Sequence, residues 1–120
     1  MVRNIILGFL LITYPMYANT MSIVAVTDPG CPVCQSWHEQ VMPGYLSKSR
    51  VYSYPSLVVK DYSSRWDRVW IRDHLRPIQY LPTFFLVEGD KVLDEFSGYS
   101  SQDDFYERLD HSLKKAESAN

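Results

Sequence analysis

The chain contains two cysteines, Cys31 and Cys34, and their spacing limits the chemistry they can do. A structural zinc site normally takes four nitrogen or sulfur ligands, and His38 is the one histidine near them in sequence. A structural disulfide across two intervening residues would constrain the unfolded chain very little. A redox pair needs a nucleophilic thiolate and a second thiol within reach, so this spacing favours a redox pair.

A redox dithiol needs a strand that carries it to the edge of a sheet and a helix that begins directly after it. Residues 22–27 are a nearly continuous apolar run rich in β-branched side chains, which predicts a buried strand. Residues 28–30, Asp-Pro-Gly, predict a turn that exposes Cys31. Pro32 suits the first turn of a helix, whose free N–H groups would face the Cys31 sulfur. This helix is expected to end or kink near residues 43–44, Pro-Gly.

The rest of the chain shows strand and helix patterns in alternation. They predict a strand at residues 57–60 and a short helix at residues 63–75. A β-hairpin of strands 83–87 and 91–96 follows, and then a closing helix at residues 101–115. The closing helix begins with a capping-box pattern and is expected to fray after Lys115. Strands that alternate with helices predict an α/β fold, and the hairpin makes its sheet mixed.

Length and charge exclude several classes of function. A chain of 120 residues is long enough for one domain, and a net charge of −2 gives no electrostatic case for nucleic acid as a partner. The densest basic cluster is interleaved with Asp67 and Asp73, which predicts a solvated helix face. Its members are Arg65, Arg68, Arg72 and Arg76.

The first residues have the order of a signal peptide. Arg3 precedes an apolar run at residues 5–12, which is closed by Pro15 and small or polar residues. The run is far shorter than the roughly 20 residues that span a bilayer. We therefore predict a signal peptide or uncleaved anchor at residues 1–18, cleaved near Ala18, and an exported, periplasmic domain at residues 19–120. A buried first strand is the alternative interpretation.

The pairing of PGCPVC with LPTFFLV, followed by a glycine and a final helix, resembles the thioredoxin superfamily over residues 21–113. Within it, DPGCPVCQSWHEQVMPGY, RPIQYLPTFFLVEGDKV and FSGYSSQDDFYERL are similar to the small periplasmic SoxS-type thioredoxins of bacterial sulfur oxidation. This resemblance implies a thioredoxin-like α/β fold, in which helices flank a mixed central sheet.

The resemblance also implies a role for each matching residue. Cys31 would be the attacking thiolate and Cys34 the resolving thiol. The substrate groove beside them would comprise a cis proline and its neighbours, namely Pro82, Leu81, Thr83 and Pro32. Neither a cofactor nor a metal is implied.

Two positions depart from the superfamily pattern. Gly30 stands where typical thioredoxins have a tryptophan, and Ala25 stands where they have a buried acid that assists the resolving thiol. Asp28 and Glu39 are candidates to replace that acid, by proximity in sequence alone.

The resemblance implies an exported thiol–disulfide oxidoreductase that reduces a partner protein by mixed-disulfide exchange. The partner would carry a disulfide or a blocked thiol, as a sulfur-oxidation carrier protein does, and a membrane thiol transporter would supply electrons to the monomer. Three alternatives remain open: a disulfide-forming oxidase, a glutaredoxin-like enzyme that binds glutathione near Gly98 and Tyr99, and a non-catalytic redox-sensing binding module.

Overall fold

Residues 21–119, the part of the chain that the computed structural model describes, contain four strands and four helices. They are β1 (Met21–Thr27), α1 (Pro32–Gln40), α2 (Met42–Tyr52), β2 (Ser56–Asp61), α3 (Arg65–His74), β3 (Thr83–Glu88), β4 (Lys91–Ser97) and α4 (Gln102–Ser118). The signal peptide predicted at residues 1–18 lies outside the described residues. None of the helices in this described part has the length and apolarity needed to cross a membrane.

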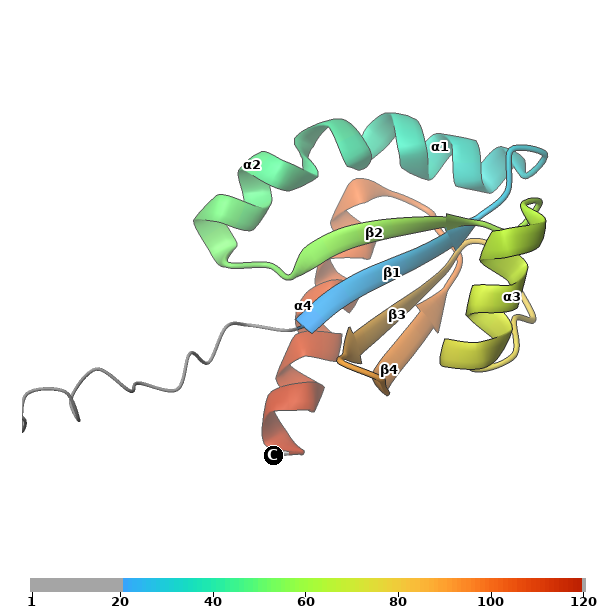
Figure 1. Cartoon of the computed structure of the whole chain (residues 1–120). Helices are drawn as coiled ribbons and strands as arrows, with labels where there is room; N and C mark the ends of the chain where they lie inside the picture. Colours follow the sequence, from blue (N-terminus) through green and yellow to red (C-terminus); the bar gives the residue numbers. More distant parts are fainter. Residues whose placement is uncertain (1–20, 120) are drawn as a thin grey trace, which may run out of the picture.

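The strands form one mixed sheet in the order β2-β1-β3-β4 (Figure 1). β1 pairs in parallel with β2 and antiparallel with β3, and β3 pairs antiparallel with β4. β1 therefore has a neighbour on each side. This central place explains why its sequence is apolar at nearly every position, as predicted for a strand whose two faces are both covered.

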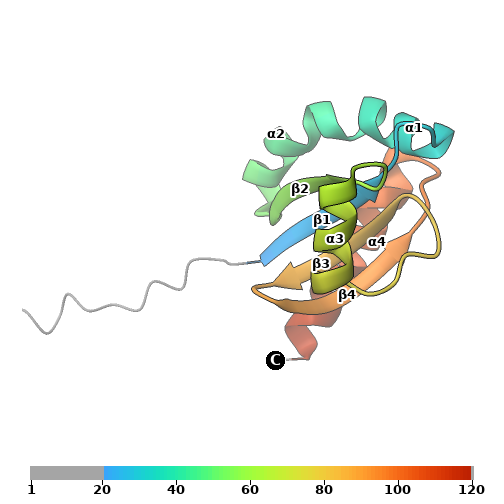
Figure 2. The same cartoon turned by 45° about the vertical axis from the view of Figure 1, so that its right-hand side comes forward.

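Side chains from β1 alternate between two separate cores, one on each face of the sheet. Ile23 and Ala25 join the larger core, which also contains residues of α1, α2 and α4. Val24 and Val26 join the smaller core, to which α3 contributes Ile71. Figure 2 shows α3 in front of the sheet and α4 behind it. The molecule is thus a three-layer α/β/α fold, which confirms the predicted class.

The larger core is built around aromatic rings that hold α1 and α4 on the sheet. Trp37 of α1 and Phe105 of α4 both pack against Phe84 of β3, at ring-centroid distances of 5.2 and 5.0 Å. All three side chains are at most 1% exposed. This packing fixes the start of α1, and hence the two cysteines, against the sheet.

Two predicted helix boundaries differ from the structure. The helix that begins at Pro32 ends at Gln40, but a second helix starts at Met42 and continues through the Pro-Gly pair to Tyr52. Pro43 lies in the first turn of that helix, where its missing N–H breaks no hydrogen bond. The prediction that α4 frays after Lys115 is wrong, because the helix runs to Ser118 and buries Ala116 in the larger core.

Three stacked tyrosines close the larger core beneath α2. Tyr45, Tyr54 and Tyr106 lie with ring centroids 5.7 to 6.4 Å apart. The Tyr45 hydroxyl donates to the Pro55 carbonyl at 2.7 Å, and the Tyr54 hydroxyl donates to the Asp110 carboxylate at 2.9 Å. Burial raises the pKa of each of the three phenols above its ordinary value.

We expect the tyrosine cluster to make the fold sensitive to alkali. Phenols in the unfolded chain ionise near pH 10. The folded chain keeps its protons to higher pH, so the stabilisation is complete below about pH 10 and is lost as the pH rises further. Urea unfolding of the full chain should therefore show a falling midpoint between about pH 9.5 and 11. Replacing Tyr45 and Tyr54 with phenylalanine should flatten that fall; an unchanged slope would contradict this account.

Candidate dithiol site

The Cys31 sulfur lies at the amino end of α1 and acts as its N-cap. The backbone N–H of Cys34 donates to this sulfur at 3.2 Å, and Pro32 occupies the first turn. Free N–H groups and the positive end of the helix dipole stabilise a negative sulfur at such a position. Cys31 is partly exposed, so a partner can reach it. The helix start predicted from the sequence is confirmed.

The second sulfur, on Cys34, is closed off from solvent. Its side chain is 0% exposed in the first turn of α1. Burial, followed by the side-chain hydrogen bond with Cys31, raises the pKa of the Cys34 thiol to about 12. A backbone hydrogen bond from Asp28 acts in the opposite direction. The two thiols therefore differ in access, and Cys34 keeps its proton at neutral pH.

The loop before β3 faces the exposed sulfur. The Leu81–Pro82 peptide bond is cis, as the resemblance implies, and the Leu81 carbonyl oxygen lies 3.8 Å from the Cys31 sulfur. The Gly98 N–H donates to the Pro82 carbonyl at 2.7 Å, which ties this loop to the start of the last connection. Segments 50 residues apart thus meet at one edge of the sheet.

The predicted groove residues differ in what they offer to a partner. Leu81 is partly exposed and Pro32 is exposed, so both present side-chain surface beside the dithiol. Pro82 and Thr83 are buried. The Thr83 hydroxyl donates to the Tyr80 carbonyl and bonds the Ser97 hydroxyl at 2.9 Å. Thr83 therefore holds the loop in place and turns its side chain away from the surface.

Within residues 21–119, neither Asp28 nor Glu39 is a buried acid like the one that Ala25 replaces. Ala25 is 0% exposed and lies within the apolar core. Of the two candidates, Glu39 is exposed on α1. Asp28 interacts with the Cys34 thiol, because its charge contributes to the raised Cys34 pKa. Its carboxylate accepts the Gly30 N–H at 2.8 Å, and its carbonyl accepts the Cys31 N–H, so it also shapes the turn.

Sequence reasoning left His38 without a role, and the structure places it beside the strand end. One ring nitrogen lies 3.2 Å from the Thr27 hydroxyl and the other 2.8 Å from the Met42 sulfur. These contacts connect α1 to β1 and to α2, and they do not involve Cys34. Within residues 21–119 no three potential metal-ligating side chains gather at one place.

Comparison with known proteins agrees with this geometry. A family model of a thioredoxin-like domain matches residues 17–113, and no curated protein matches the chain. The reduced periplasmic thioredoxin SoxS from Paracoccus pantotrophus is 24% identical over 80% of this chain and 98% of its own, with a TM-score of 0.63. A thioredoxin from Thermus thermophilus is 16% identical over 80% and 75%, with a TM-score of 0.59. Thioredoxin f2 from Chlamydomonas reinhardtii is 15% identical over 78% and 79%, with a TM-score of 0.58. At these identities the likeness establishes the fold.

Proposed function

We propose that this chain, which belongs to the thioredoxin-like family, is exported and works as a reductant. Thiol–disulfide oxidoreductase activity follows from that family and from the spacing of the cysteines. The proposal concerns the order of attack, the direction of electron flow, the partner and the compartment. One observation carries it: a partly exposed sulfur that caps the N-terminus of a helix stands next to a fully buried one.

The chemistry divides between the two sulfurs. The Cys31 thiolate attacks one sulfur of the partner's disulfide, forms a mixed disulfide and expels the partner's other sulfur as a thiolate. The Cys34 thiol then gives up its proton and attacks Cys31, which releases the second partner thiolate. Two electrons have passed to the partner, whose two thiolates can take up the proton released by Cys34 and one from solvent, and Cys31 and Cys34 are left joined as a disulfide. The adjacent Leu81 backbone would pair with the partner segment during the exchange.

The direction of transfer is proposed as reduction of the partner. Thioredoxin-fold oxidants that insert disulfides usually carry an inserted helical domain, and within residues 21–119 the elements follow one another without one. A glutaredoxin-like use of glutathione is less well supported. Asp103 and Asp104 occupy the first turn of α4, and their negative charges would repel a glutathione carboxylate bound there.

The compartment and the partners rest on sequence order and on likeness to a periplasmic thioredoxin. We propose export to the periplasm through residues 1–18, where a membrane thiol donor reduces the dithiol. The substrate would be a protein disulfide or blocked thiol, such as that of a sulfur-oxidation carrier. The chain would act as a monomer without nucleic acid.

The experiment that tests this function supplies the full chain with either of two substrates. With dithiothreitol as electron source, it should accelerate reduction of insulin disulfides. With a reduced, unfolded protein and the chain in its oxidised form, it should form disulfides far more slowly. Efficient disulfide formation with no insulin reduction would favour the oxidase, and neither activity would favour the binding module.

A further inference from the structure

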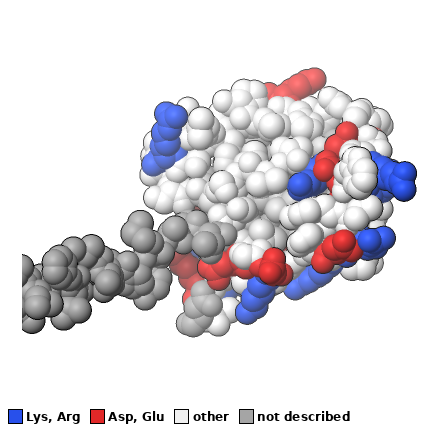
Figure 3. Space-filling model, in the orientation of Figure 1, with Lys and Arg blue, Asp and Glu red and all other residues white. Residues whose placement is uncertain are grey.

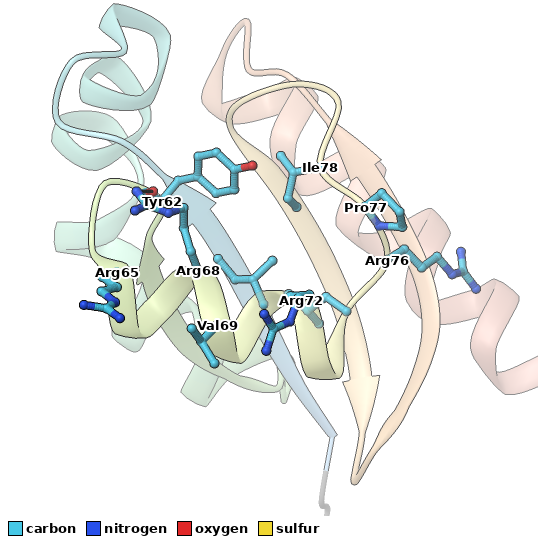
Figure 4. Close-up of a pocket in the computed structure, with 10 residues that line it drawn as sticks. Tyr62, Arg65, Arg68, Val69, Arg72, Arg76, Pro77 and Ile78 are labelled. Carbon is cyan, nitrogen blue, oxygen red and sulfur yellow. Dashed lines mark hydrogen bonds between the residues drawn. The ribbon is translucent and has the colours of Figure 1, made fainter.

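A pocket of about 510 Å³ opens between α3 and the segment that leads toward the cis proline (Figure 4). We call it the arginine pocket. It is defined here by Arg65, Arg68, Arg72, Ile71, Leu75 and Ile78. The sequence predicted that these arginines lie on a solvated helix face. The structure confirms that all three are exposed, and it shows in addition that they border a concave site whose inner surface is aliphatic.

The arginine pocket adjoins the dithiol site. Tyr62 lines one end of it, and the Tyr62 N–H donates to the Thr27 carbonyl at 2.7 Å, directly before the turn that carries Cys31. On the opposite wall, Ile78 packs in the same core cluster as Leu81. Figure 4 shows the Tyr62 ring and Ile78 facing each other across that end. A segment bound in the pocket would therefore continue toward the exposed sulfur.

Among the described residues, two guanidinium groups at the pocket have no carboxylate partner. Arg72 pairs with Asp73 at 3.0 Å, and Arg76 pairs with Glu95 at 3.0 Å and points away from the pocket (Figure 4). In contrast, Arg65 and Arg68 form no salt bridge within residues 21–119.

The donors of Arg68 remain partly free. Its Nη1 donates to the carbonyls of Tyr62 and Ser63 at 3.1 and 3.3 Å, which holds the side chain at the mouth of the pocket. A guanidinium has five N–H donors, so others stay available to a carboxylate. Figure 3 shows Lys and Arg side chains gathered with a few carboxylates on the right-hand side of the molecule, where α3 lies.

Two exposed aromatic residues are close in sequence to residues of the arginine pocket. Trp66 is 78% exposed on α3 beside Arg65, and Tyr80 is 68% exposed in the loop before the cis proline. Tryptophan, tyrosine and arginine are the residue types that most often carry binding energy in protein interfaces. Arg65 and Arg68 beside an aliphatic hollow that continues toward the dithiol point to a polypeptide ligand, because a small anion would use the guanidinium groups alone.

We propose that the arginine pocket binds an acidic segment of the partner protein, adjacent to the partner's disulfide. Carboxylates of that segment pair with Arg65 and Arg68, and an apolar side chain enters the hollow over Ile71 and Leu75. The proposal rests on the proposed function and names the chemistry of its substrate. Charge complementarity of this kind raises the rate of encounter and selects among partners.

The test uses peptides of one length, each with one internal disulfide and one leucine, flanked by two glutamates, two glutamines or two lysines. The reduced full chain, R65Q/R68Q and the control R50Q are compared by the second-order rate constant for each peptide. Glutamine retains helix propensity, and Arg50 is an exposed residue of α2, not of the pocket. At low salt, the chain should reduce the acidic peptide roughly 10-fold faster than the basic one. Salt screening should remove most of this difference at about 0.5 M NaCl.

In R65Q/R68Q, the ratio of the acidic-peptide rate constant to the basic-peptide rate constant should fall by about 3- to 10-fold. R50Q should keep the ratio of the unmodified chain. The rate constant for the neutral peptide should be the same in all three proteins. Equal rates with acidic and basic peptides in the unmodified chain would overturn the proposal, as would a uniform loss with all peptides in R65Q/R68Q.

A second arm separates this proposal from the proposed function. The acidic peptide with both cysteines replaced by serine is titrated calorimetrically into each protein, and R65Q/R68Q should weaken its binding by a similar factor. Failure to reduce any peptide would contradict the proposed function. The calorimetric titration would still test whether the arginine pocket binds the acidic peptide, because it needs no redox activity. Weakened binding of glutathione with unchanged binding of the peptide would assign the pocket to a small anion and overturn the proposal.

Discussion

Replacement of Cys31 by serine is expected to lower the rate of disulfide reduction by roughly 10³-fold or more, because it removes the nucleophile. Cys31 carries the partly exposed sulfur of the pair, and the other is 0% exposed. Serine is among the best N-cap residues, so the variant keeps the cap of α1 and should unfold at nearly the same urea concentration. The rate is measured with dithiothreitol and insulin.

Cys34→Ser is the matched control for that result. It leaves the first attack possible and removes the second, so a covalent complex with the substrate should accumulate through Cys31. Mass spectrometry of the trapped complex identifies the linked residue. Retention of turnover in Cys31→Ser, or a substrate linked through Cys34 in the unmodified chain, would reverse the assigned order of attack.

The second large effect is expected in alkylation of the buried thiol. With a pKa of about 12, only about one Cys34 in 10⁴ is ionised at pH 8, whereas an ordinary cysteine is roughly one-quarter ionised. Iodoacetamide should therefore modify Cys34 about 10³-fold more slowly than a cysteine in an unstructured peptide. The reaction rate should rise about tenfold per pH unit, because the thiolate fraction does so below the pKa.

Peptide mapping after timed alkylation measures this rate. Cys31→Ser is followed in parallel, because it keeps the burial of Cys34, which is the main cause of the raised pKa, and removes the smaller contribution of Cys31. Rapid modification of Cys34 at pH 8, or a rate that levels off below pH 10 while the chain stays folded, would contradict the account.

Much of this fold could be predicted because local patterns and tertiary packing agree. The apolar run at residues 22–27 lies in the centre of the sheet, and Ser101 caps α4 by accepting the Asp104 N–H at 3.1 Å. The resemblance to the thioredoxin superfamily, carried by the two cysteines and the segment around Pro82, is confirmed by the family comparison. Strong local signals thus located both halves of the site.

Helix α2 could not be predicted, because its sequence lacks a clear apolar face. Tyr45 is its one buried residue, whereas Leu46, Val51 and Tyr52 are exposed. The Pro-Gly pair near its start predicts a helix end, because proline interrupts a helix anywhere except in its first turn. The sequence alone did not show that Pro43 falls in the first turn of a new helix. The end of α4 depended on Ala116, whose burial comes from the completed core and not from local propensity.

The geometry of the dithiol depends on contacts that no local pattern encodes. The distance between the Cys31 sulfur and the Leu81 carbonyl is set by the packing of α1 and β3 on a common core. The same holds for the arginine pocket: spacing placed the arginines on one helix, but the opposite wall comes from the segment that contains Ile78. Interleaved charges therefore predicted the solvated face correctly but could not predict the pocket beside it.

We propose that Cys31 and Cys34 form a working redox pair that reduces a partner. Equilibration of the full chain with defined mixtures of reduced and oxidised dithiothreitol or glutathione gives the reduction potential of this pair. We expect a value near that of thioredoxins, about −270 mV. A value near that of the strongest oxidants of this fold, about −120 mV, would mean that the pair donates its disulfide, and would contradict the claim.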